Sequence, residues 1–118
     1  MDETVDVQGT SIGVGTIVAL AFFAYGRYID ETILGLDPTM LAIGAFAATF
    51  AAIAVLHGAY GRRDFAVAHA VAAIGLVLVA PATSALQVLG GYLLLVVGGA
   101  YIALVTIRTR KAEREAAG

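Results

Sequence analysis

Two histidines, His57 and His69, are the only side chains within the long apolar segments of this 118-residue chain that titrate near neutral pH. They lie on either side of the charged tripeptide at residues 62–64, at nearly equal distances from it. If that tripeptide is a turn between antiparallel helices, the rise of about 1.5 Å per residue places both rings at the same depth. The two imidazoles could then pair, bind a metal ion, or ligate a haem from opposite sides.

Three interpretations of this histidine pair stay open. The first is structural, because a histidine near a membrane interface is tolerated when its ring nitrogens reach a hydroxyl, a carbonyl or water. The second is a pH-sensitive or proton-handling role, and the third is a metal or haem b site. A metal would need further ligands, yet no carboxylate lies at that depth and the chain has no cysteine. We therefore predict no metal and no cofactor, with haem b as the alternative.

The elements that would hold these histidines follow from the distribution of charge. Asp, Glu, Lys and Arg are absent from residues 9–26, 38–61 and 65–107. The last stretch, as one helix, would be about 65 Å long, twice the roughly 30 Å of a bilayer core. It must therefore reverse, and Pro81 marks the place.

The prediction is a single all-α domain over residues 1–118, an up-down transmembrane four-helix bundle. The expected spans are residues 9–28, 38–61, 65–80 and 86–107, with a partly helical tail at 108–118. Residues 1–8 are expected to form an acidic tail, and Ile29, Ile33 and Leu36 an interfacial helical turn. Asp37 and Pro38 form a typical helix start.

Basic residues set the expected orientation. With four spans, six of the seven lie on one side: Arg62, Arg63, Arg108, Arg110, Lys111 and Arg114. The positive-inside rule then predicts a multi-pass protein of the plasma membrane with both termini in the cytoplasm. Tyrosine and arginine near the span ends are expected to anchor the helices at the interfaces; these residues are Tyr25, Arg27, Tyr60, Arg62 and Arg63.

Small residues at helical spacing predict close helix contacts. They are Gly44, Ala48 and Ala52 in the second span, and Gly91 and Gly98 in the fourth. Small residues let helix backbones approach closely in lipid. The same pattern serves an internal bundle or a homo-oligomer equally well.

The composition resembles that of small four-helix membrane proteins of haloarchaeal type, with six Arg to one Lys and abundant Ala, Val and Gly. No expected loop exceeds about eleven residues and no catalytic motif is present, so we expect neither an enzyme nor catalytic residues. No basic patch with interleaved aromatics supports nucleic-acid binding. The leading hypothesis is a structural or accessory subunit that packs with itself or a larger membrane complex. The alternatives are a homo-oligomeric channel or carrier with the histidines at its cytoplasmic mouth, and a haem-bearing electron-transfer subunit.

Overall fold

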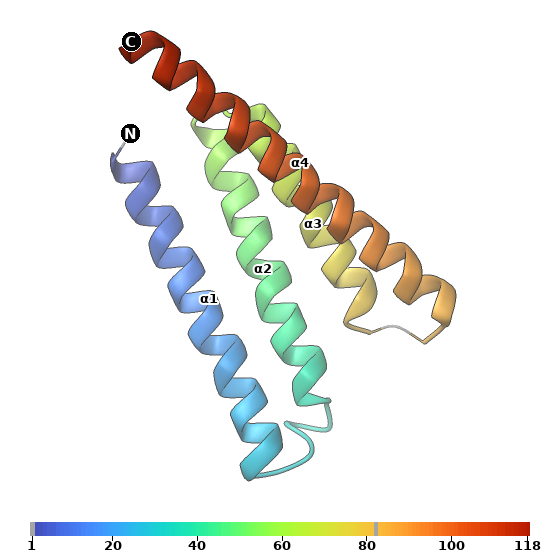
Figure 1. Ribbon diagram of the computed structural model, residues 1–118. Coiled ribbons are helices and arrows are strands. Elements are labelled where there is room, and N and C mark those ends of the chain that lie inside the picture. Colours follow the sequence, from blue (N-terminus) through green and yellow to red (C-terminus); the bar gives the residue numbers. More distant parts are fainter. Residues whose placement is uncertain (1, 82) are drawn as a thin grey trace.

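The protein is all-helical. The computed structural model describes residues 2–81 and 83–118, which form four helices: α1 (Asp2–Tyr28), α2 (Pro38–Ala59), α3 (Arg63–Val79) and α4 (Ala85–Ala117). Consecutive helices alternate in direction, so that both termini lie at the same end of the molecule (Figure 1). Backbone contacts join α1 to α2, α2 to α3 and α3 to α4, and no other pair of helices comes as close among the described residues. The helices therefore form an open row, in which α1 does not close onto α4.

Three of the four helices can cross a membrane by length and composition. They are α1 from Asp6 onward, α2 and α4. Helix α3 has 17 residues, which at 1.5 Å per residue gives about 25 Å against a hydrocarbon core of roughly 30 Å. The structure thus supports a helical membrane protein, and the passage of α3 through the bilayer stays a prediction.

The segment between α1 and α2 differs from the expected interfacial helix. Ile33 and Leu36 exchange two backbone hydrogen bonds, of 2.9 and 3.0 Å, around a tight turn. Its central residues, Leu34 and Gly35, both have positive φ, 53° and 80°, which is typical of a type I′ turn. The prediction of a helical turn was wrong because apolar spacing carries no information about the left-handed backbone that glycine permits here.

The ends of the helices are closer to expectation. The Asp37 side chain accepts a hydrogen bond of 2.8 Å from the Thr39 amide, and Pro38 is the first residue of α2, so the predicted helix start is confirmed. Ser84 caps α4 by accepting from the Gln87 amide at 3.1 Å. Helix α1 begins at Asp2 and so includes the acidic residues expected to form a tail. A hydropathy pattern marks the apolar part of a helix, whereas the helix itself can continue into water.

The contact between α3 and α4 depends on glycine. A Cβ atom on Gly98 would lie 2.8 Å from the Ala72 nitrogen and 3.0 Å from the Ala68 oxygen. Gly75 of α3 and Gly91 of α4 face each other in the same way, since a Cβ on Gly91 would lie 2.8 Å from the Gly75 oxygen. Backbones that approach this closely gain dispersion energy, which is the main attraction between helices in lipid.

The glycine contact can be tested with two adjacent residues. We expect Gly98→Ala to lower the stability of the protein by about 1–3 kcal/mol, because the added methyl group meets backbone atoms that must move apart. Gly99→Ala is the matched control, since a Cβ there has no atom within 4 Å. Thermal unfolding in detergent, followed by circular dichroism, measures both. Equal melting temperatures for the two variants would contradict the packing described here.

Candidate functional site

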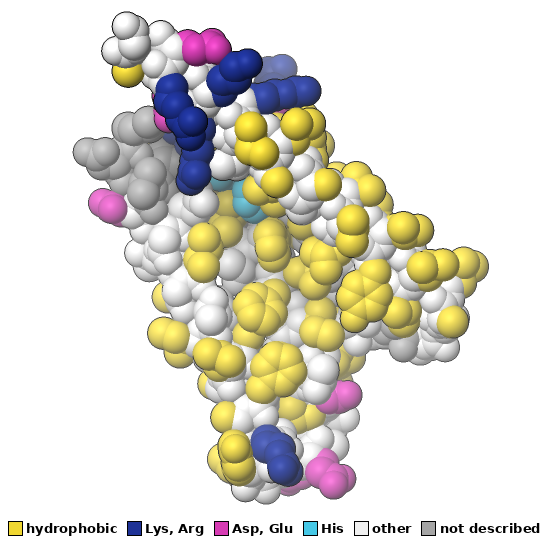
Figure 2. Space-filling model, viewed as in Figure 1, with side chains coloured by type: hydrophobic (Ala, Val, Ile, Leu, Met, Phe, Trp, Pro, Cys, Tyr) yellow, Lys and Arg dark blue, Asp and Glu magenta, His cyan; other side chains and the backbone are white. Residues whose placement is uncertain are grey.

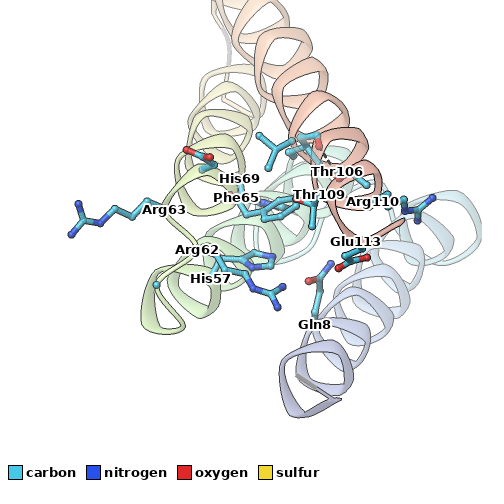
Figure 3. A pocket seen from close by; sticks show the side chains of 14 residues that line it. Gln8, His57, Arg62, Arg63, Phe65, His69, Thr106, Thr109, Arg110 and Glu113 are labelled. Carbon is cyan, nitrogen blue, oxygen red and sulfur yellow. Dashed lines mark hydrogen bonds between the residues drawn. The ribbon is translucent and has the colours of Figure 1, made fainter. Parts of the chain in front are cut away.

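A cavity of about 720 Å³, lined by both polar and apolar side chains, lies at the end of the molecule where both termini are found. Residues from all four helices line it, among them Gln8 of α1, His57 of α2, His69 of α3, and Thr109 and Glu113 of α4 (Figure 3). It is thus the place where distant parts of the sequence meet around polar side chains.

His57 and His69 form a close pair at this cavity. Their ring centroids are 5.3 Å apart with the planes inclined by 31°. Both side chains are buried, with exposed fractions of 2% and 6%. Sequence spacing predicted two rings at one depth, and the structure brings them into contact.

The turn between α2 and α3 positions the two rings. His57 lies in the last turn of α2, and its carbonyl accepts a hydrogen bond of 2.8 Å from the Arg62 amide. Gly61 supplies the positive φ of 76° that this reversal needs. The turn is therefore at residues 60–62, slightly earlier than the charged tripeptide, and α3 already begins at Arg63.

The two histidines differ in their hydrogen bonding. His69 Nδ1 donates to the Phe65 carbonyl at 2.8 Å, one helical turn earlier, which fixes the proton of a neutral ring on Nδ1. Neither ring nitrogen of His57 has a hydrogen-bond partner among the described residues, although both atoms are buried. An unsatisfied buried polar atom costs about 1–3 kcal/mol. His57 is therefore the group in this site with unused binding capacity.

Aromatic rings enclose the pair. The Phe65 ring stacks on His57 at 5.0 Å between centroids with an inclination of 26°, and Phe50 lies 5.8 Å from His69. These rings provide apolar walls, so that the histidines form a polar spot in apolar surroundings. Phe50 is far from the α2–α3 turn in the sequence, so its contact with His69 was not predicted.

Charged residues surround the mouth of the cavity. Three guanidinium groups (Arg62, Arg63 and Arg110) and two carboxylates (Asp64 and Glu113) line it. Figure 3 shows Arg62 beside His57, whereas the Arg63 and Arg110 side chains extend outward. The basic residues of the α2–α3 turn and the end of α4 thus gather at one end, as Figure 2 also shows.

Across this end, the Tyr101 hydroxyl donates to Asp64 Oδ1 at 3.2 Å and joins α4 to α3.

The predicted interface anchors occupy both ends of the row. Arg27 places its guanidinium 5.9 Å from the ring centroid of Tyr28, and so pairs with a neighbour other than Tyr25. Tyr60 is exposed beside Arg62 in the α2–α3 turn. These positions are compatible with anchoring at two opposite interfaces.

The predicted packing residues fall into two groups. Gly91 and Gly98 lie in the α3–α4 contact described above. On α2, a Cβ on Gly44 would have no neighbour within 4 Å, and Ala48 and Ala52 are exposed. The contact of α2 with α1 uses Gly15 and Gly26 instead, which would clash with Thr49 and Pro38 if they carried a side chain.

The two histidine rings lie closer together than rings on opposite sides of one haem iron would lie. Two imidazoles on opposite sides of one metal ion, each bonded at about 2 Å, would have centroids about 6 Å apart. The observed 5.3 Å is shorter, and Phe65 stacks directly on His57. The described residues also contain no group of three or more His, Cys, Asp or Glu placed to hold a metal ion.

Sequence reasoning identified the histidines but not the rest of the cavity. Gln8 comes from α1, Phe65 from α3, and Thr109 and Glu113 from α4, and no motif connects them. A signal did exist for Gly75, since Ala68, Ala72 and Gly75 repeat the spacing of small residues recognised in α4. Comparisons with known protein families, with curated proteins and with solved structures give no match for this chain.

The unequal hydrogen bonding of the two histidines predicts unequal effects of substitution. In detergent without added lipid, His57→Phe should leave the melting temperature unchanged or raise it, because it removes two unsatisfied buried nitrogens. His69→Phe should lower the stability by about 0.5–1.5 kcal/mol through loss of the bond to Phe65. Differential scanning fluorimetry compares the two variants. A larger loss for His57→Phe than for His69→Phe would contradict the hydrogen bonding described here.

Proposed function

We propose that the protein is a structural or accessory membrane subunit that assembles with a second copy of itself through the joint face of α1 and α2. The observation that carries this proposal is a shallow groove of about 430 Å³ between the two helices, lined mainly by small side chains. They include Ser11, Gly15, Ala45, Ala48 and Ala52. Such a surface lets another helix come close enough for dispersion and backbone contacts to hold it in lipid.

The weak attachment of α1 supports the same proposal. Helix α1 contacts α2 alone, and Ala19 is its only buried residue among those whose side chains are described. A helix with so small an internal contact gains stability from a further neighbour. In a two-fold dimer the same surface of both copies forms the interface, so the small residues of one groove would pack against those of the other.

A transport role is the second candidate, and the cavity with its unpartnered His57 favours it. A route across the membrane would have to continue beyond the histidines. The parts of α2 and α3 on that side, residues 38–56 and 70–79, carry no ionisable side chain. Carriers coupled to protons or sodium commonly keep such groups within the membrane, so assembly remains the better-supported function.

Cysteine cross-linking tests the assembly, because the natural chain has no cysteine. We expect Ala48→Cys and Ala52→Cys to form disulfide-linked dimers in native membranes under mild oxidation. Val97→Cys on α4, also exposed to the surroundings at 58%, is the matched control and should stay monomeric. Ala48→Trp should abolish cross-linking at Ala52, whereas Val97→Trp should not. Equal cross-linking at all three cysteines, or none at any, would contradict the proposal.

The second part of the proposal places both termini in the cytoplasm of a plasma-membrane protein. An even number of spans puts both termini on the same side of the membrane. The positive-inside rule then places the basic end, at the cavity, in the cytoplasm. A C-terminal fusion to green fluorescent protein should therefore fluoresce in bacteria, and a C-terminal alkaline phosphatase fusion should be inactive. Phosphatase inserted after Gly35 should be active. An active C-terminal phosphatase would exclude four spans with this orientation.

A further inference from the structure

We propose that the cavity at the histidine pair binds the phosphate headgroup of an anionic membrane lipid. The site does not depend on the assembly proposed above, because no residue lines both the cavity and the α1–α2 groove. Its recognition groups are His57 at the inner wall and Arg62 at the mouth.

The ring of His57 has unused hydrogen-bonding capacity. The side chain is 98% buried, since its exposed fraction is 2%, and neither ring nitrogen has a partner among the described residues. The ring nevertheless lines the cavity. Buried polar groups are almost always hydrogen-bonded in native proteins, so a ligand with hydrogen-bonding atoms belongs at this wall.

The guanidinium groups at the mouth of the cavity favour a negatively charged ligand. The side chain of Arg62 lies beside His57 at the mouth (Figure 3), and Arg63 and Arg110 also border the cavity, although their side chains extend outward. Asp64 and Glu113 also line the cavity, so three guanidinium groups against two carboxylates leave its lining with a small net positive charge. Guanidinium groups bind phosphate through two parallel hydrogen bonds, and they bind an anion more strongly where water is partly excluded.

The apolar surface beside the cavity favours a lipid over a soluble anion. Residues of α1 and α4 both line the cavity, and the described residues of these two helices make no close backbone contact with each other. On the face shown in Figure 2 the histidine lies at the back of a hollow, and hydrophobic side chains continue along the molecule below it. A phospholipid matches this arrangement, with its phosphate at the polar end and its acyl chain along the apolar part. Basic pockets between membrane helices on the cytoplasmic side bind anionic headgroups in this way.

The test compares lipids by thermal unfolding and by native mass spectrometry of the purified full-length protein. The probes are phosphatidylglycerol, phosphatidylcholine and inorganic phosphate, each added to protein in neutral detergent. We expect phosphatidylglycerol to raise the melting temperature and to stay bound with about tenfold preference over phosphatidylcholine, whose choline cation offsets the phosphate charge. Equal stabilisation by inorganic phosphate would overturn the lipid as the source of the anion.

Two variants and a matched control locate the site. His57→Phe and Arg62→Gln should each weaken the retention of phosphatidylglycerol by about tenfold, the loss expected for one charge-assisted hydrogen bond. Arg114→Gln removes the same charge from the last turn of α4, outside the cavity, and this variant should bind the lipid as the natural protein does. Each variant is compared with its own melting temperature in phosphatidylcholine, which separates lost binding from lost folding.

Three results would overturn the proposal. The first is unchanged lipid preference in both cavity variants, which would leave water as the partner of His57. The second is an equal loss in Arg114→Gln, which would show attraction by the whole basic end. The third is a changed oligomeric mass in the cavity variants, which would place a second polypeptide in the cavity.

Discussion

The close approach of α3 to its two neighbours is the interaction on which the rest of the structure depends. Lipid provides no hydrophobic drive for helices to associate, so their attraction comes from dispersion and hydrogen bonds at short range. Helix α3 obtains this range with Ala68, Ala72 and Gly75 against α4, and toward α2 its Ala66 lies opposite Gly58. It is also the shortest of the four helices. A short central helix held by backbone proximity fixes α2 and α4, whereas the described part of α1 makes close backbone contacts with α2 alone.

The histidine site is a consequence of this same approach. The tight turn at Gly61 places the end of α2 against the start of α3, and the small residues beyond it let the two helices stay close. His57 and His69 are therefore forced into contact in a region where their nitrogens have few partners. Helix α4 passes over this region and closes one wall of the cavity with Val105 and Thr109. On its far side, the described residues of α1 make no close backbone contact with α4.

The sequence predicted these features unevenly, and the reason is physical. Charge distribution and hydropathy report the solvent of each segment, so four helices, the Asp37 cap and the common depth of His57 and His69 could be foreseen. Contacts between helices depend on which face each helix turns inward. In the sequence, an apolar face that contacts lipid has the same composition as one that contacts protein. For that reason the small residues of α4 entered a contact, whereas Ala48 and Ala52 on α2 stayed exposed. The hydrogen bond of His69 and the missing one of His57 depend on side-chain geometry, which no spacing encodes.

Packing and hydrogen bonds within the chain account for one of the two histidines but not for the other. His69 satisfies Nδ1 within its own helix and can be explained as a structural residue. His57 cannot be explained in this way, because an apolar side chain of similar size would pack against Phe65 without two buried, unpaired nitrogens. The unpaired nitrogens of His57 destabilise the isolated fold, and a partner outside the chain that completes their hydrogen bonds would remove this cost. The opening of the cavity toward the apolar face beside a basic rim makes a membrane lipid the partner that supplies both an anion and an apolar chain.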